Sequence, residues 1–254
     1  MITSAQNPKI KLVRALQSRA KARRKEGAFV IEGVRLFEEA TKAHWPIRFV
    51  LYDNSLSERG RELLKALNDV DIEELDAALL KSISDTETSQ GILAVLDYES
   101  LRYPENANFV LIPDQIRDPG NLGTLIRTAA AAGVDVVIIP PETTDAFAPK
   151  VLRAGMGAHF RLPIISMDWD EIEVRVWGLT VYLAEMQADV SYTAANLTQA
   201  CAVIVGGEAE GASESARGLV DQSIHIPMKD ETESLNAAVA GAIILFEAAR
   251  QRSS

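Results

Sequence analysis

Polar segments follow apolar runs at three places in the second half of this 254-residue chain. They read PDQIRDPGNLGTLIR after FVLI, GGEAEGAS after AVIV, and PMKDETESLN after SIHI. Each pattern predicts a buried strand, a turn and the start of a helix. The carboxyl ends of parallel strands share one edge of a sheet, where α/β proteins bind ligands. We therefore expect the three turns to form one site.

The first and last segments carry amides and a cation. Asn121 and Arg127 are six residues apart, which is less than two helical turns if Asn121 begins a helix. Arginine stays protonated at neutral pH, so Arg127 suits contact with an anionic group rather than a role as a base; the alternative is a surface salt bridge. Ser234 suits an N-cap. Asn236 is a poor helix former at the mouth of an Ala-rich helix, which suggests a further role.

The middle segment offers flexible backbone and one carboxylate. Gly206 and Gly207 allow the main chain to approach a ligand closely. Glu208 follows them near an expected helix start. Its carboxylate either takes part in chemistry or only interacts with the helix dipole.

Together the three segments resemble the motifs of the SpoU-type RNA ribose 2′-O-methyltransferases of the SPOUT superfamily. The matching patterns are N-x-G-x-x-x-R (Asn121, Gly123, Arg127), G-x-E-x-x-G (Gly206, Glu208, Gly211) and I-P-M followed by S-L-N. Order, spacing and strand context agree over roughly residues 109–250. Asp230 departs from the pattern, because many relatives carry glycine there.

The resemblance implies transfer of a methyl group from S-adenosylmethionine to a ribose 2′-hydroxyl of RNA, without a metal. It implies catalytic roles for Asn121, Arg127, Glu208, Ser234 and Asn236, and cofactor contacts, mostly by main chain, at Gly206, Gly207, Ile226, Met228 and Leu235. It also implies a parallel sheet with a deep trefoil knot and a homodimer whose active site lies near the subunit interface. Pattern alone favours an ordinary doubly wound nucleotide-binding sheet.

Charge is distributed unevenly. The net charge is −10, yet residues 1–25 hold eight basic side chains and no acid. A basic element on an acidic body can still bind phosphates, because salt screens repulsion beyond about 10 Å. The predicted RNA-binding residues are Lys9, Lys11, Arg14, Arg23, Arg24 and Arg35. The alternatives are a solvated amphipathic helix packed on its own domain and, for Arg35, a surface salt bridge.

Two α/β domains are expected: residues 1–97, with a basic helix and a small RNA-binding domain, and residues 109–254, the catalytic domain, joined by a linker at 98–108. FVIEGVRLFEEA and TSQGILAVL resemble the substrate-binding domain of many SpoU-type enzymes, a sandwich related to RNA-binding ribosomal proteins. Gln90-Gly91 forms either a turn or an RNA contact. Apolar periodicity predicts strands at 28–31, 47–52, 70–75, 92–96, 109–113, 134–139, 179–184, 202–206 and 223–226, and helices from residue 8 and at 33–43, 57–67, 121–132, 168–176, 212–220 and 234–251.

Composition excludes several classes of protein. One cysteine, expected to be buried, and three histidines cannot form a disulfide framework or a metal cluster. The chain has no apolar run of membrane-spanning length and begins without a secretory pattern, so we expect a cytoplasmic protein. A dinucleotide-dependent oxidoreductase would show G-x-G-x-x-G after its first strand, and the segment after residue 113 lacks it.

Two rivals keep the same fold: a transfer RNA methyltransferase and a non-catalytic RNA-binding or ribosome-assembly factor. The presence of Asn121, Arg127 and Asn236 opposes the non-catalytic rival. The N-terminal extension with Asn7-Pro8-x-Ile10-Lys11 resembles family members that act on ribosomal RNA more than those that act on transfer RNA.

Overall fold

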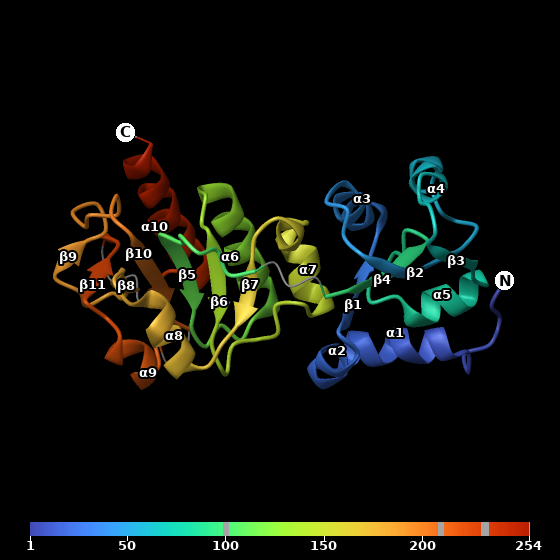
Figure 1. Ribbon diagram of the computed structural model, residues 1–254, viewed down its shortest axis with the longest axis horizontal. Coiled ribbons are helices and arrows are strands. Elements are labelled where there is room, and N and C mark those ends of the chain that lie inside the picture. The colour runs from blue at the N-terminus through green and yellow to red at the C-terminus, as the bar shows by residue number, and fades with distance from the viewer. Residues whose placement is uncertain (99–101, 208–210, 230–233, 254) are drawn as a thin grey trace. The chain divides into compact units, whose positions relative to one another are not determined.

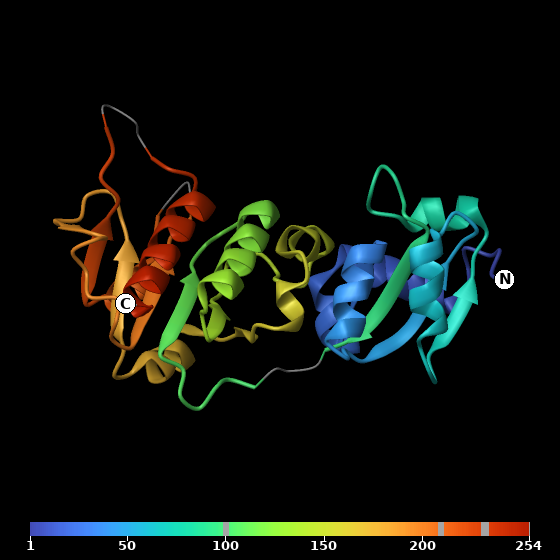
Figure 2. The same cartoon turned by 90° about the horizontal axis from the view of Figure 1, so that it is seen from above.

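A computed structural model describes residues 1–98, 102–207, 211–229 and 234–253. The chain forms two compact units (Figures 1 and 2): residues 1–99 with 147–160, called the first unit, and residues 100–146 with 161–254, called the second unit. The segment 147–160 therefore packs with the first unit, although the expected domain boundaries assign it to residues 109–254.

The first unit is a mixed four-stranded sheet with helices on its faces. Its helices are α1 (Pro8–Ser18), α2 (Ala20–Glu26), α3 (Val34–Lys42), α4 (Glu58–Lys65), α5 (Ala77–Ile83), α7 (Pro149–Gly155) and the 3-10 helix η1 (Ala158–Phe160). Its strands are β1 (Ala28–Glu32), β2 (Ile47–Tyr52), β3 (Asp71–Glu74) and β4 (Ile92–Asp97), in the order β1-β4-β2-β3. Only the β2–β3 pairing is parallel among these strands.

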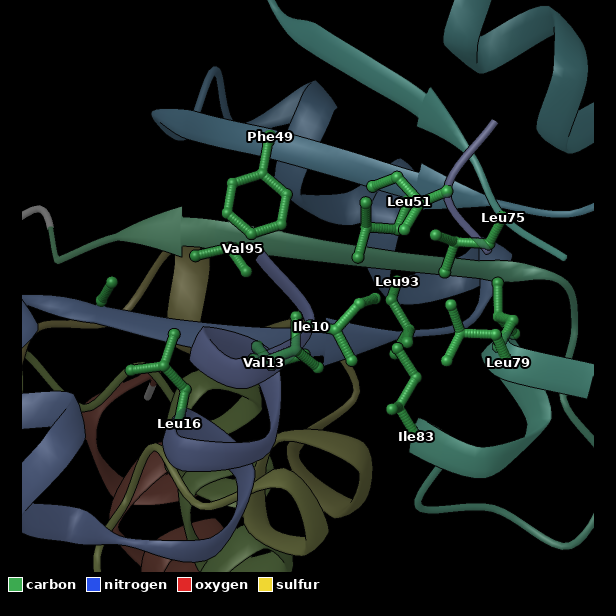
Figure 3. Packing of buried hydrophobic residues seen from close by; sticks show 14 residues of the cluster. Ile10, Val13, Leu16, Phe49, Leu51, Leu75, Leu79, Ile83, Leu93 and Val95 are labelled. Carbon is green, nitrogen blue, oxygen red and sulfur yellow. The ribbon is translucent and has the colours of Figure 1, made fainter. Parts of the chain in front are cut away.

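The basic helix α1 is part of the hydrophobic core. Ile10, Val13 and Leu16 lie three residues apart on one face and are fully buried. Figure 3 shows them packed against side chains of β2, β4 and α5. The predicted amphipathic stripe is thus confirmed, and α1 contributes to the hydrophobic core of this unit.

Aromatic packing explains why residues 147–160 belong to the first unit. Phe147 lies 5.0 Å from Phe29 between ring centroids, and Phe160 lies 5.3 Å from Trp45. Such pairs bury large areas of apolar surface and add specific edge-to-face contacts. Residues 147–160 therefore supply part of the first unit's core.

The second unit contains a seven-stranded parallel sheet. Its strands are β5 (Phe109–Pro113), β6 (Val136–Ile139), β7 (Ile164–Ser166), β8 (Thr180–Ala184), β9 (Val190–Ser191), β10 (Cys201–Val205) and β11 (Gln222–His225). Their spatial order is β7-β6-β5-β10-β8-β11-β9. Its helices are α6 (Pro119–Ala132), α8 (Trp169–Val176), α9 (Glu214–Gly218) and α10 (Ala237–Arg252).

Helices cover both faces of this sheet. Ile172 and Val176 of α8 and Ala216 of α9 pack on one face. Helices α6 and α10 pack together on the other face (Figure 1), where a Cβ on Gly241 would come within 2.4 Å of Leu125. The central strands β5, β6 and β10 are wholly buried, as their uninterrupted apolar runs predict. The predicted parallel sheet is confirmed, and the trefoil knot stays a prediction because strand order alone does not define a knot.

Element boundaries differ from the prediction where caps decide them. Helix α6 begins at Pro119 rather than Asn121, because Asp118 accepts a hydrogen bond from the Asn121 N–H at 2.9 Å. Helix α10 begins at Ala237 rather than at Ser234. The predicted elements also omitted α5, α7, β7 and β9, which are too short to show a clear period.

Candidate active site

Turns from the second and third sequence motifs meet around one cavity at the carboxyl edge of the parallel sheet, and no residue of the first motif is among its described lining residues. The five predicted cofactor-binding residues all line it: Gly206, Gly207, Ile226, Met228 and Leu235. Ser234 lines the same cavity, and so do Leu183, Ile224 and Ile244. Side chains and backbone far apart in sequence thus form one concave surface, which combines apolar walls with main-chain polar groups.

Glycines let the loops approach one another. The N–H groups of Gly207 and Gly211 donate to each other's carbonyl oxygens at 3.0 and 3.1 Å, which closes a short loop after β10. A Cβ on Gly207 would stand 2.5 Å from the Gln115 carbonyl oxygen, and one on Gly206 would stand 2.7 Å from the Ala212 nitrogen. Larger residues would therefore push the loop after β10 away from the loop after β5.

Asn236 joins the first and third motifs. Its Oδ1 accepts hydrogen bonds from the N–H groups of Ala238 at 2.9 Å and Val239 at 3.2 Å, so Asn236 is the N-cap of α10. Its Nδ2 donates to Asn121 Oδ1 at 3.0 Å. Sequence reasoning offered Ser234 as the cap, and this was wrong because α10 begins at Ala237 and its N-cap is Asn236.

The remaining predicted catalytic residues are exposed or lie outside the described residues. Arg127 is exposed on α6, and Ser234 is exposed at the cavity beside Leu235. Glu208 and Asp230 lie outside the residues that the structure describes.

A buried acid that sequence reasoning missed supports the loop after β10. Asp114 directly follows β5 and is 0% exposed. Its Oδ2 accepts a hydrogen bond from the Ser213 N–H at 2.6 Å, whereas its Oδ1 is buried without a hydrogen-bond partner in the described structure. Burial raises the pKa of Asp114, and the hydrogen bond from Ser213 opposes this shift.

A second acid at this edge was also missed. Glu185 directly follows β8, lines the cavity and forms an ion pair with Arg217 of α9 at 2.6 Å. Asp114 and Glu185 share a sequence signal, since each is an acid placed just after an apolar strand. Apolar walls, backbone donors and one ion pair fit a nucleoside that carries a short amino-acid chain, as S-adenosylmethionine does.

Two of the predicted RNA-binding residues are held inside the first unit. Lys9 forms ion pairs with Asp71 and Glu73. Arg23 is 4% exposed, and its Nη1 donates to the Leu16 carbonyl oxygen at 2.5 Å at the end of α1. Both charged groups already have partners within the first unit, and RNA contact by these two residues stays a prediction.

The other predicted basic residues face solvent. Lys11 and Arg14 of α1, Arg24 of α2 and Arg35 of α3 are exposed. Arg14 also donates to the Ser82 hydroxyl at 3.3 Å. These side chains remain available for contacts with phosphate groups.

Gln90 and Gly91 have structural roles. Gln90 Oε1 accepts a hydrogen bond from the Val34 N–H at 2.8 Å and so caps α3. Gly91 has φ +73°, and a Cβ there would stand 2.7 Å from the Leu56 nitrogen. The turn alternative therefore accounts for both residues.

No group of three or more His, Cys, Asp or Glu side chains among the described residues is arranged to hold a metal ion. No helix in that part of the chain is both long and apolar enough to cross a bilayer.

Comparison with known proteins identifies the family. Residues 108–246 match the SpoU rRNA Methylase family, and residues 7–94 match the MRM3-like substrate binding domain. The chain is 34% identical to the 23S rRNA (guanosine(2553)-2′-O)-methyltransferase RlmP of Bacillus subtilis, over 96% of this chain and 97% of that protein. It is 31% identical to the 23S rRNA (uridine(2479)-2′-O)-methyltransferase of Streptomyces viridochromogenes, over 99% and 92% of the two chains.

A solved structure agrees with these sequence matches. The SpoU methyltransferase AviRb from Streptomyces viridochromogenes, crystallised with AdoMet, superposes with a TM-score of 0.90 and 31% identity, over 98% of this chain and 99% of that one. This chain therefore belongs to the SpoU rRNA Methylase family. The resemblance stated from the three motifs is confirmed.

Proposed function

We propose that this protein transfers a methyl group from S-adenosylmethionine to a ribose 2′-hydroxyl of ribosomal RNA. One observation carries the proposal: the five residues that the family motifs predict for cofactor binding line a single cavity beside the Asn121–Asn236 pair. Family membership and the AdoMet complex of AviRb support the same activity.

The cavity residues would hold the cofactor chiefly through their shape. Ile226 and Leu235 provide apolar contact, and the backbone at Gly206 and Gly207 provides close polar contact. When bound, S-adenosylmethionine supplies an electrophilic methyl group on a positively charged sulfur. The loops then need to position the acceptor hydroxyl in line with that methyl group and to exclude water.

Catalytic groups would act on the RNA side of the cavity. Arg127 holds the adjacent phosphate and stabilises negative charge that develops on the 2′-oxygen. The hydrogen bond from Asn236 to Asn121 fixes both amides, so they orient the ribose or Arg127. Ser234 adds a hydroxyl at the rim, and Glu208 remains a predicted catalytic residue on the family motif alone.

Cofactor binding can be tested directly. Calorimetric titration with S-adenosylmethionine, with and without a chelator, is expected to give the same affinity in both cases. Affinity that a chelator removes would contradict metal-free binding. Failure to bind the cofactor or its demethylated product would contradict the proposed activity itself.

Ribosomal RNA is the proposed substrate because both relatives named above act on 23S rRNA. They methylate a guanosine and a uridine at different positions, although their identities to this chain are similar. Mapping ribose methylation in ribosomal and transfer RNA from cells with and without the protein tests the choice. A site lost only from transfer RNA would favour the rival substrate, and no lost site would favour a non-catalytic factor. A cytoplasmic location belongs to this proposal, and cell fractionation tests it.

A homodimer through α10 is also part of the proposal. Val239 and Phe246 of α10 are 48% and 52% exposed. They are seven residues apart, so they lie on the same side of the helix. Exposed apolar side chains aligned in this way suit contact with a second copy.

Light scattering with two matched variants tests this interface. Phe246→Glu is expected to shift the protein to monomer, because it places a charge in the apolar contact. Trp177, just after α8, is 87% exposed, so Trp177→Glu serves as the control and should leave the mass unchanged. The opposite pattern would place the interface at α8.

A further inference from the structure

Two opposite charges form part of the wall of the cavity. Glu185 Oε1 and Arg217 Nη1 are 2.6 Å apart. Among the lining residues that the structure describes, these two are the ones with ionisable side chains. Neither belongs to the three family motifs, so their presence at the cavity calls for a separate explanation.

Regular structure fixes the position of the pair. The Glu185 N–H donates to the Ile224 carbonyl oxygen at 3.0 Å, which extends the ladder between β8 and β11. The Ser223 hydroxyl donates to Glu185 Oε2 at 3.3 Å. On the other side, Arg217 Nη2 lies 3.6 Å from the point where a Cβ on Gly211 would stand, so the guanidinium lies beside the loop after β10.

A carboxylate held in this way keeps unused acceptor capacity. Two oxygens offer about four lone-pair sites, and Arg217 and Ser223 occupy two of them. The Glu185 side chain is 29% exposed, so a ligand in the cavity can reach the remaining sites. The pair is therefore suited to receive hydrogen bonds from a bound molecule.

We propose that Glu185 accepts hydrogen bonds from the ribose hydroxyls of S-adenosylmethionine and that Arg217 holds the carboxylate in place. This assignment rests on the proposed function. Acidic side chains near the carboxyl ends of parallel strands recognise ribose hydroxyls in other nucleotide sites. Glu185 occupies the corresponding place directly after β8.

Charge indicates which polar group of the cofactor suits the Glu185–Arg217 pair. The methionine ammonium is positive, but Arg217 neutralises most of the charge of Glu185, so the pair offers the ammonium little net attraction. The ribose diol is neutral, so it gains a charge-assisted acceptor without meeting a like charge. An ion pair in the wall therefore favours the diol over the ammonium.

Calorimetry on the full chain with three ligands tests the assignment. S-adenosylmethionine and S-adenosylhomocysteine carry both ribose and amino acid, whereas 5′-methylthioadenosine keeps the ribose and lacks the amino acid. Glu185→Gln is expected to weaken all three by a similar factor, roughly 10- to 100-fold, because hydrogen bonds to a charged acceptor are lost. A loss limited to the two ligands with an amino acid would overturn the ribose assignment, and so would unchanged affinity for all three.

Further variants separate local effects from general ones. Glu38 of the first unit is also ion-paired, with Lys42 and Arg59, so Glu38→Gln is the matched control and should leave affinity unchanged. Arg217→Lys keeps a positive charge near Glu185 and is expected to lose less affinity than Glu185→Gln. The reverse order would overturn the assignment of ribose binding to Glu185 and positioning to Arg217. Thermal unfolding checks that each variant is folded. A wild-type protein that binds none of the ligands would instead refute the proposed function.

Discussion

Two buried carboxylates, one in each unit, show different uses of a polar group. Glu32 ends β1 in the first unit and accepts hydrogen bonds from the Ser84 hydroxyl, the Asp85 N–H at 3.0 Å and the Thr86 hydroxyl at 2.7 Å. Asp114 follows β5 in the second unit and is bonded through one oxygen, to Ser213, while its other oxygen has no partner in the described structure.

The number of hydrogen-bond partners distinguishes a carboxylate that stabilises the fold from one that lies at the site. A fully bonded carboxylate such as Glu32 ties a loop to a strand and has little capacity for a ligand. Burial of an incompletely bonded carboxylate such as Asp114 has a desolvation cost, and Asp114 lies where the loops come together around the cavity. The same contrast applies to the basic side chains. Lys9 and Arg23 have partners inside the first unit, whereas Lys11 and Arg24 face solvent.

The largest effect is expected at the exposed arginine of the first motif. Arg127→Ala should lower turnover by about 10²–10³-fold, because charge that develops only in the transition state loses its stabilisation. Cofactor affinity should change little, since Arg127 does not line the cavity. Single-turnover methylation beside calorimetry measures both.

A charge-preserving variant controls this prediction. Arg127→Lys should rescue poorly, because lysine lacks the planar fork that binds phosphate through two hydrogen bonds. Turnover near the wild-type level for Arg127→Ala would remove this residue from the active site.

Matched amide substitutions test the two carboxylates. Glu32→Gln should lower the unfolding free energy by about 1–3 kcal/mol, because a charged acceptor with several donors is lost. Asp114→Asn should cost less than about 1 kcal/mol, since the amide oxygen can still accept from Ser213 and a buried charge disappears. Urea unfolding of both variants at neutral pH makes the comparison. Equal losses would mean that the number of hydrogen-bond partners does not distinguish them.

The raised pKa of Asp114 adds a pH dependence. A raised folded-state pKa gives stability that is fully present below the unfolded value, about 3.9, and is lost as pH rises through the folded value. Asp114→Asn removes that loss, so the variant should gain stability relative to wild type as pH rises above about 4. A constant difference between the two proteins across this range would show that the carboxyl group has no such shift.

Asn236 combines a structural and a site contact, and two variants separate them. Asn236→Asp keeps the N-cap oxygen but loses the N–H that donates to Asn121. Asn236→Ala loses both and should cost about 1 kcal/mol of stability as well as turnover. Single-turnover methylation should show a lower rate in both variants. Thermal unfolding should show a loss of stability only in Asn236→Ala. Full activity of Asn236→Asp would restrict this residue to capping.

The smallest effect is expected on the basic surface of the first unit. Each phosphate contact contributes roughly 0.7–0.9 to the salt slope of RNA affinity. Replacing Lys11 and Arg24 with Gln should flatten this slope, whereas Lys9→Gln and Arg23→Gln should mainly lower stability. RNA titrations over a range of salt concentrations distinguish these outcomes. Substitution is preferable to deleting residues 1–25, because deletion also removes Ile10, Val13 and Leu16 from the core.

Local patterns in the sequence were sufficient for the family, the buried strands and the residues around the cavity. The apolar runs of β5, β6 and β10 predict a parallel sheet, and the loop motifs select Gly206, Gly207, Ile226, Met228 and Leu235, which all line one cavity. These features are readable because a strand, a turn and a helix start each occupy a few consecutive residues.

Only the tertiary structure decided which polar groups are already bonded. Lys9 meets Asp71 and Glu73, which lie 62 and 64 residues further along the chain. Asp114 meets Ser213 across 99 residues, and Glu185 meets Arg217. Phe147 and Phe160 pack on Phe29 and Trp45 in the other half of the sequence. Hydrogen-bond partners and core contacts depend on the folded path of the chain, so periodicity and motif spacing do not contain them.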